Sequence, residues 1–97
     1  MKLPGYKQYK KEWHVGEETY TLKFVSRIPG CKAKDVGLCD PESRIMYVKK
    51  GLSKAMLYRT VAHELLHAIE FEYEIEIPHK LVYQLEKAIV DTQLMNL

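Results

Sequence analysis

Hydrophobic and polar residues alternate along the first half of the chain with the period of two that is typical of β-strands. Residues 12–15 and 19–25 show this alternation on either side of Gly16-Glu17-Glu18, which predicts a hairpin. The second of these strands is rich in β-branched and aromatic residues, as strands usually are. One of its faces carries Tyr20, Leu22 and Phe24.

A second hairpin is expected further along the chain. Residues 36–39 lead into Asp40-Pro41-Glu42-Ser43, and residues 44–48 lead out of it. The Asp-Pro pair favours a turn because proline presets its backbone torsion and the aspartate side chain bonds the nearby backbone. Pro29-Gly30 marks another turn, between the two hairpins.

The period of the pattern changes from two to 3.6 near Ser53, which is a favourable N-cap residue. We predict one helix over residues 53–72 and a second over residues 78–95, with Pro78 in its first turn. Four glutamates at the end of the first helix oppose its macrodipole, so we expect this helix to end near Glu72. The expected fold class is α+β, with a small antiparallel N-terminal sheet packed on two C-terminal helices.

Composition and charge are ordinary for a globular protein, with 46% hydrophobic and 29% charged residues, and residues 1–97 are expected to form a single domain. The net charge of +2 comes from lysines and arginines that are spread thinly along the sequence. We interpret Lys7, Lys10 and Lys11, which lie among aromatic residues, as a solvated end, so nucleic acid is not expected as a partner. No apolar run or secretory signal indicates a membrane, so we expect a cytoplasmic protein.

The first predicted helix contains His63-Glu64-Leu65-Leu66-His67, the H-E-x-x-H pattern of zinc-dependent metallopeptidases. Two histidines four residues apart point the same way from a helix, and neutral imidazoles are good zinc ligands. On the helical wheel we place His63, Glu64 and His67 opposite an apolar arc. That arc consists of Leu57, Tyr58, Val61, Ala62, Leu65, Ala68 and Ile69. Glu64 is the candidate general base, and the expected cofactor is a zinc ion, Zn2+.

A catalytic zinc site needs three protein ligands and one open position. A straight helix cannot bring a third side chain around the metal, so the third ligand is expected from a separate element. His79, in the first turn of the second helix, is the preferred candidate, and Glu86 on the same face is the alternative. Glu70, one turn beyond His67, is placed to hydrogen-bond a ligating imidazole.

The two cysteines, Cys31 and Cys39, are expected to be free thiols, with Cys39 buried and inert. An alternative is a structural zinc site that both cysteines form with His63 and His67. Such sites usually space their cysteines as C-x2-C to C-x4-C, and the two cysteines of this chain are further apart. The alternative is therefore less favoured than free thiols.

These motifs resemble those of the very small zincin-like metallopeptidase domains of phage and prokaryotic genomes, which are distantly similar to the ImmA/IrrE and SprT-like groups. The matching segments are Gly37-Leu38-Cys39-Asp40, Ile45-Met46-Tyr47-Val48, Gly51-Leu52-Ser53, Thr60 to Glu70 and Ile77-Pro78-His79. The resemblance implies a small sheet packed on the motif helix, with His63 and His67 as zinc ligands and Glu64 as general base. It also implies that the following helix supplies the third ligand.

The activity that the resemblance implies is a zinc metallopeptidase acting on a peptide or protein substrate, with Glu64 taking a proton from metal-bound water and returning it to the leaving amine. By analogy, an exposed sheet edge at residues 44–48 would align an extended peptide by strand addition. The chain departs from larger peptidases because it lacks a long C-terminal subdomain, and because Val90 stands where gluzincins place an aspartate after Glu86. The alternative function is a catalytically inactive, zinc-bound module with a regulatory or binding role.

Overall fold

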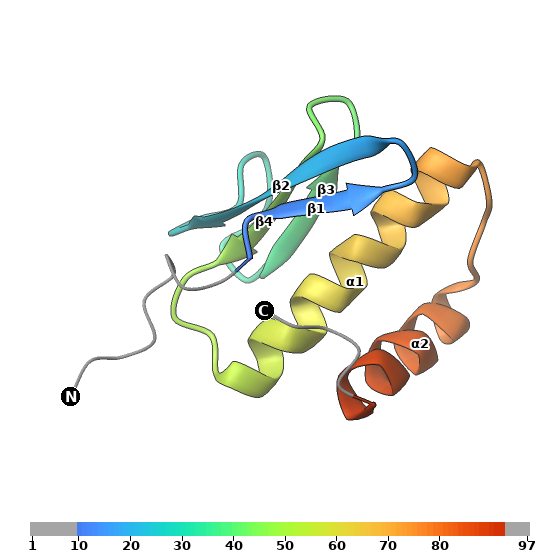
Figure 1. Ribbon diagram of the computed structural model, residues 1–97. Coiled ribbons are helices and arrows are strands. Elements are labelled where there is room, and N and C mark those ends of the chain that lie inside the picture. The colour runs from blue at the N-terminus through green and yellow to red at the C-terminus, as the bar shows by residue number, and fades with distance from the viewer. Residues whose placement is uncertain (1–9, 93–97) are drawn as a thin grey trace.

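The computed structural model describes residues 10–92, in which four strands are followed by two helices (Figure 1). The strands are β1 (Glu12–Val15), β2 (Glu18–Val25), β3 (Gly37–Asp40) and β4 (Ile45–Lys49). The helices are α1 (Lys54–Tyr73) and α2 (His79–Asp91). Both predicted hairpins and both predicted helices are confirmed. Met95, the predicted end of the second helix, and Lys7 lie outside the described residues.

The strands form one mixed sheet in the order β1-β2-β4-β3. β1 pairs with β2 and β3 pairs with β4 in the antiparallel manner of the predicted hairpins. β2 and β4 are parallel, however, with Val25 opposite Lys49, so the prediction of an antiparallel sheet is wrong where the two hairpins join. The reason is that residues 26–36 carry the chain past β4 to the far edge before it turns back.

The sheet edge that lies near α1 is β3, not the predicted edge strand at residues 44–48. β4 is paired on both sides, with β2 and with β3, so that prediction is wrong. The Lys49 N–H donates to the Val36 carbonyl (2.8 Å), and successive residues of an antiparallel strand face opposite ways. The backbone N–H and C=O groups of Gly37 and Cys39 therefore point away from β4, toward the open edge.

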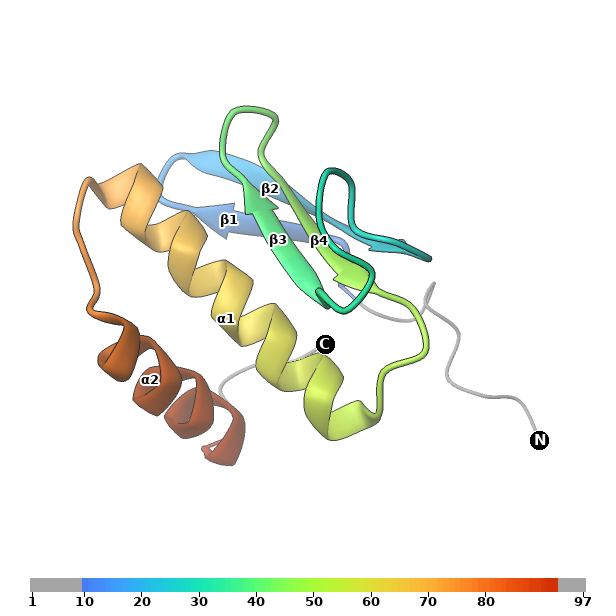
Figure 2. The same cartoon turned by 180° about the vertical axis from the view of Figure 1, so that it is seen from behind.

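α1 packs across one face of the sheet, and α2 packs on α1, so that α1 lies between the sheet and α2 (Figures 1 and 2). The core between the sheet and α1 consists of Trp13, Val15, Tyr20, Leu22, Met46, Val48, Leu57, Val61 and Ala68. The shared face predicted for Tyr20, Leu22 and Phe24 is confirmed, with Phe24 half-buried against this core. Because α1 has a neighbour on either side, much of its polar face is also covered.

The two ends of α1 follow ordinary capping rules. The Ser53 hydroxyl accepts a hydrogen bond from the Met56 N–H (3.2 Å), which caps the first turn. The helix ends at Tyr73, and Glu74 adopts the left-handed conformation (φ 53°), which confirms termination near Glu72. Neither helix among residues 10–92 is long and apolar enough to cross a membrane.

Candidate metal centre

His63 and His67 stand one turn apart on α1, and their rings meet edge-on with the two Nε2 atoms close together. The two Nε2 atoms are 3.1 Å apart, and the ring centroids are 4.7 Å apart with an interplanar angle of 75°. The two side chains are 23% and 34% exposed, so they are neither core residues nor fully solvated ones. A small ligand can therefore reach the Nε2 atoms from the surface.

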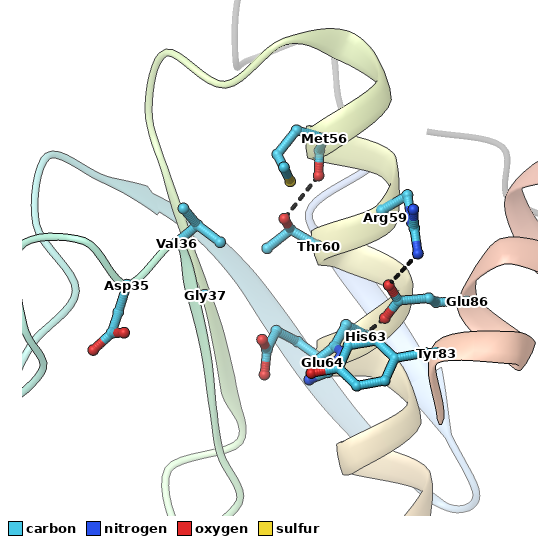
Figure 3. Close-up of a pocket in the computed structure, with 10 residues that line it drawn as sticks. All are labelled: Asp35, Val36, Gly37, Met56, Arg59, Thr60, His63, Glu64, Tyr83 and Glu86. Atoms are coloured by element: carbon cyan, nitrogen blue, oxygen red, sulfur yellow. Dashed lines mark hydrogen bonds and ion pairs between the residues drawn. The ribbon is translucent and has the colours of Figure 1, made fainter. Parts of the chain in front are cut away.

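The His63 ring is held through its other nitrogen by Glu86 of α2. His63 Nδ1 lies 2.7 Å from Glu86 Oε2, and Arg59 Nη2 donates to Glu86 Oε1 at 2.9 Å (Figure 3). Glu86 is buried, and its two oxygens are shared between the side chains of His63 and Arg59. Because both carboxylate oxygens are engaged, Glu86 orients His63 in this structure, and its role as the alternative third ligand stays a prediction.

The His67 ring is held in the same way by Glu70, which confirms the contact predicted between these two residues. His67 Nδ1 lies 2.8 Å from Glu70 Oε1. Glu70 Oε2 accepts the backbone N–H of Ile77 at 2.8 Å, and this bond, together with His67, holds the pKa of Glu70 below its ordinary value. Glu70 therefore ties the ring of His67 to the linker that leads into α2.

These hydrogen bonds fix the tautomers of both rings. An ionised carboxylate can only accept hydrogen bonds, so Nδ1 of each histidine must carry a proton. In a neutral ring, Nε2 is then an acceptor with a lone pair. Two lone pairs that face each other at 3.1 Å repel, unless a cation or one additional proton lies between them. The two Nε2 atoms are therefore arranged to bind a cation or to share one additional proton.

The separation of the two Nε2 atoms suits zinc. Two nitrogens at 2.0–2.1 Å from a tetrahedral zinc ion lie about 3.3–3.4 Å apart. The 3.1 Å separation of the His63 and His67 Nε2 atoms is close to this value, and both lone pairs face the shared space. Carboxylate partners on Nδ1 are also the usual outer support of ligating histidines. The side chains present therefore fit a zinc ion at the His63–His67 pair.

Glu64 points from α1 toward β3 and not toward solvent (Figure 3). It is only 6% exposed, and its carboxylate accepts a hydrogen bond from the backbone N–H of Cys39. Burial raises the pKa of Glu64 to about 7, although His67 and the Cys39 N–H act in the opposite direction. The prediction that Glu64 lies opposite the apolar arc of α1 is wrong. Glu64 follows Leu57 by seven residues, which is nearly two full turns, so the two side chains leave the helix axis within about 20° of each other.

β3 approaches α1 most closely at Gly37, and the approach requires glycine. A Cβ atom on Gly37 would lie 2.7 Å from Glu64 Oε2 and 2.7 Å from Thr60 Cγ2, which is closer than non-bonded atoms come. In the sequence, Gly37 was named only as part of the segment Gly37-Leu38-Cys39-Asp40, and no role was predicted for it. No local pattern reveals its role, because the approach depends on how β3 and α1 pack.

His79 is the first residue of α2 and is exposed. It lines a cavity of about 460 Å³ together with His67 and Glu70. Within residues 10–92, no group of three or more His, Cys, Asp or Glu side chains is arranged to hold a metal ion. The structure therefore places His79 near His67 but does not assemble it with His63 and His67 as a three-ligand set, and its role as third ligand stays a prediction.

Both cysteines are free and half-buried, so Cys39 is less buried than predicted. Burial and the nearby Glu64 carboxylate raise the pKa of the Cys39 thiol to about 12, which keeps the thiol protonated and agrees with the expectation that it is inert. The alternative zinc site of two cysteines and two histidines is not assembled in the described part of the chain.

A cavity of about 470 Å³ opens beside His63 between β3, α1 and α2 (Figure 3). Arg59 and Tyr83 line it, and the Tyr83 ring centroid lies 5.8 Å from that of His63. Neither residue was predicted from the sequence as part of the site. Arg59 precedes His63 by four residues and Tyr83 precedes Glu86 by three, so helical periodicity is the signal that places each beside the site.

Comparison with known proteins identified no relative of this chain. No protein-family model matches it, and neither the curated proteins nor the solved structures gave a match. The resemblance to small zincin-like domains therefore rests on the sequence motifs alone and stays an expectation.

Proposed function

We propose that this chain is a zinc-dependent metallopeptidase of the zincin type. The observation that carries the proposal is the pair of Nε2 atoms on His63 and His67, which face each other while a carboxylate holds each Nδ1. A buried carboxylate, Glu64, lies beside the pair on the same helix. Two zinc ligands with an adjacent carboxylate base are the components that metal-assisted hydrolysis of an amide requires.

Each residue of the site would have one task. His63 and His67 would hold the ion through Nε2, and Glu86 and Glu70 would fix the two rings. The bound ion would supply a polarised water whose pKa is lowered toward about 7. Glu64 would accept the proton of that water and give it to the nitrogen of the leaving amine. Glu64 lines the same cavity as His63.

The substrate would bind as an extended peptide along the edge of β3. The outward N–H and C=O of Gly37 can pair with an added strand, whereas the Cys39 N–H is occupied by Glu64. The open edge runs beside the face of α1 that carries Thr60 and Glu64, so a peptide paired with it would lie against the site. Because β3 is short, it would hold only a few residues of such a peptide.

The test is hydrolysis of a quenched-fluorescent peptide library by the zinc-loaded protein and by Glu64→Gln. We expect Glu64→Gln to lower hydrolysis by roughly 10²–10⁴-fold, the scale of a lost general base, and to leave zinc binding nearly intact. Glu17→Gln, which changes an exposed carboxylate in the turn between β1 and β2, is the matched control and should behave as wild type. Equal hydrolysis by Glu64→Gln and wild type would contradict the proposal.

A second candidate is a zinc-bound module without turnover. Two observations favour it: Glu64 is held by the Cys39 N–H, and the described residues do not assemble a third ligand at the pair. Such a module would need the histidines but not the carboxylate of Glu64. An in vivo effect that survives Glu64→Gln and is lost in His67→Ala would favour it over the peptidase.

A further inference from the structure

The fold gathers at one end of the sheet the basic residues that are dispersed in the sequence. β2 and β4 are parallel and finish together, with Val25 opposite Lys49, and β1 begins beside the end of β2, where the Leu22 N–H donates to the Lys11 carbonyl. The loop at residues 26–36 and the start of α1 lie at the same end, to the right in Figure 2. This surface, the basic end, carries Lys10, Lys11, Lys23, Arg27, Lys32, Lys34, Lys49, Lys50 and Lys54.

The loop that contributes three of these residues is held in place. Ile28 is 1% exposed and anchors the loop in the protein interior. Lys49 Nζ donates to the carbonyl of Ala33 at 2.8 Å, and the Lys32 N–H donates to the Asp35 carboxylate at 2.9 Å. The charges of the loop therefore keep a fixed spacing relative to those on the strands.

Acidic residues are nearly absent from the basic end. Glu12 and Asp35 are the acids on it, and Asp91 lies nearby because the end of α2 packs beside the start of α1. Asp35 already accepts the Lys32 N–H, and Asp91 pairs with Lys87. The opposite end of the molecule carries Glu17, Glu18, Asp40, Glu42, Glu70, Glu72, Glu74 and Glu76. The net charge of +2 thus conceals a strong separation of charge, and the basic end presents a positive field to an approaching partner.

We propose that the basic end binds the phosphate backbone of a nucleic acid, without reading its sequence. Phosphate contacts require spaced, exposed cations, and every basic residue listed above except Lys49 is exposed. Trp13 lies under Lys10 (4.8 Å to the ring centroid) but is only 8% exposed, so it is not available to stack on a base. The binding is therefore electrostatic.

The distribution of apolar side chains favours a nucleic acid over a bilayer surface. Binding to a membrane surface is strengthened when apolar side chains stand among the basic ones. Among the described residues, the exposed Phe71, Tyr73 and Ile75 lie at the opposite, acidic end, and Leu81 and Tyr83 lie on α2. Met56, in the first turn of α1, is the one large exposed apolar side chain of the described residues that stands beside the basic end. A bilayer that met the basic end would therefore gain a single apolar side chain, and the cations would supply most of the interaction.

The test is fluorescence anisotropy with a labelled DNA duplex of about 30 base pairs, at salt concentrations from about 50 to 200 mM. The variant is Lys34→Glu with Lys50→Glu, two exposed residues of the basic end that lie away from the histidine pair. The matched control is Lys80→Glu with Lys87→Glu on α2, which changes the net charge by the same amount.

We expect wild-type affinity to fall steeply with salt, by a log–log slope of about −0.9 for each phosphate contacted. The basic-end variant should bind at least roughly tenfold more weakly at low salt, with a slope that is shallower by about 2, and the control should bind as wild type. Equal losses in the two double variants would overturn the proposal, because net charge alone would then explain binding. So would the absence of binding at the lowest salt, or tighter binding to vesicles containing phosphatidylserine than to the duplex.

Discussion

Replacing either carboxylate that holds a histidine ring should weaken zinc binding, although neither residue is expected to touch the ion. Glutamine offers one acceptor oxygen and one donor group where glutamate offers two acceptors. Glu86 accepts from both Arg59 Nη2 and His63 Nδ1, and Glu70 accepts from both His67 Nδ1 and the Ile77 N–H. In each glutamine variant, one of these donors would face an amide N–H₂ group and lose its partner.

The expected loss of zinc affinity is about 10–100-fold for each variant, or roughly 1.4–2.7 kcal/mol. Glu86→Gln should lie toward the upper end of this range because the Glu86 side chain is 7% exposed, whereas that of Glu70 is 19% exposed and water can replace part of what is lost. Zinc affinity is measured by competition with a chromophoric chelator, and Glu17→Gln, in the exposed turn between β1 and β2, serves as control. Wild-type affinity in both variants would refute the reasoning.

Two further predictions concern the packing around the site. Gly37→Ala should destabilise the fold by about 1–3 kcal/mol in denaturant unfolding, because the new methyl group meets Glu64 and Thr60. Adding Thr60→Ser, which removes the nearby methyl group, should recover part of this loss. An unchanged unfolding midpoint in Gly37→Ala would show that β3 does not approach α1 so closely. The Tyr20 hydroxyl donates to the Glu72 carboxylate at 2.6 Å and lowers the pKa of that carboxyl. The hydrogen bond therefore stabilises the fold above the ordinary glutamate pKa of about 4.3, and this stabilisation is lost as pH falls through the lower pKa of Glu72 in the folded protein. Tyr20→Phe should therefore lose less stability than wild type between about pH 5 and pH 3 in thermal unfolding, and parallel losses in the two proteins would contradict this.

The elements of the fold could be predicted from the sequence because their signals are local. The alternation of residues 19–25, the turn at Asp40-Pro41 and the change of period near Ser53 each depend on a few neighbouring residues. The parallel pairing of β2 with β4 could not be predicted in this way. Alternation shows which face of a strand is buried, but it does not show which neighbour the strand pairs with across the residues 26–36.

The residues of the candidate site also fall into those that local spacing predicts and those that depend on packing between elements. His63, His67 and the contact of His67 with Glu70 follow from helical spacing within α1. The roles of Glu86 and Gly37 arise from α2 and β3 packing against α1, which a helical wheel does not contain. The basic end could not be predicted from the sequence for the same reason, because its residues are distant in sequence and become neighbours only when the strands pair.

The central claim, a zinc ion held by His63 and His67, is tested most directly by titrating zinc into chelator-stripped protein in competition with a chromophoric chelator. We predict one zinc ion per chain, with affinity lost in His63→Ala and His67→Ala and weakened in His79→Ala about as much as in His67→Ala. Unchanged affinity in His79→Ala would exclude His79 as the third ligand, and a loss in Glu86→Ala well beyond the roughly 10–100-fold expected from ring orientation would then assign that role to Glu86. No saturable zinc binding by the wild-type protein, or binding that survives in both His63→Ala and His67→Ala, would contradict the metal centre itself.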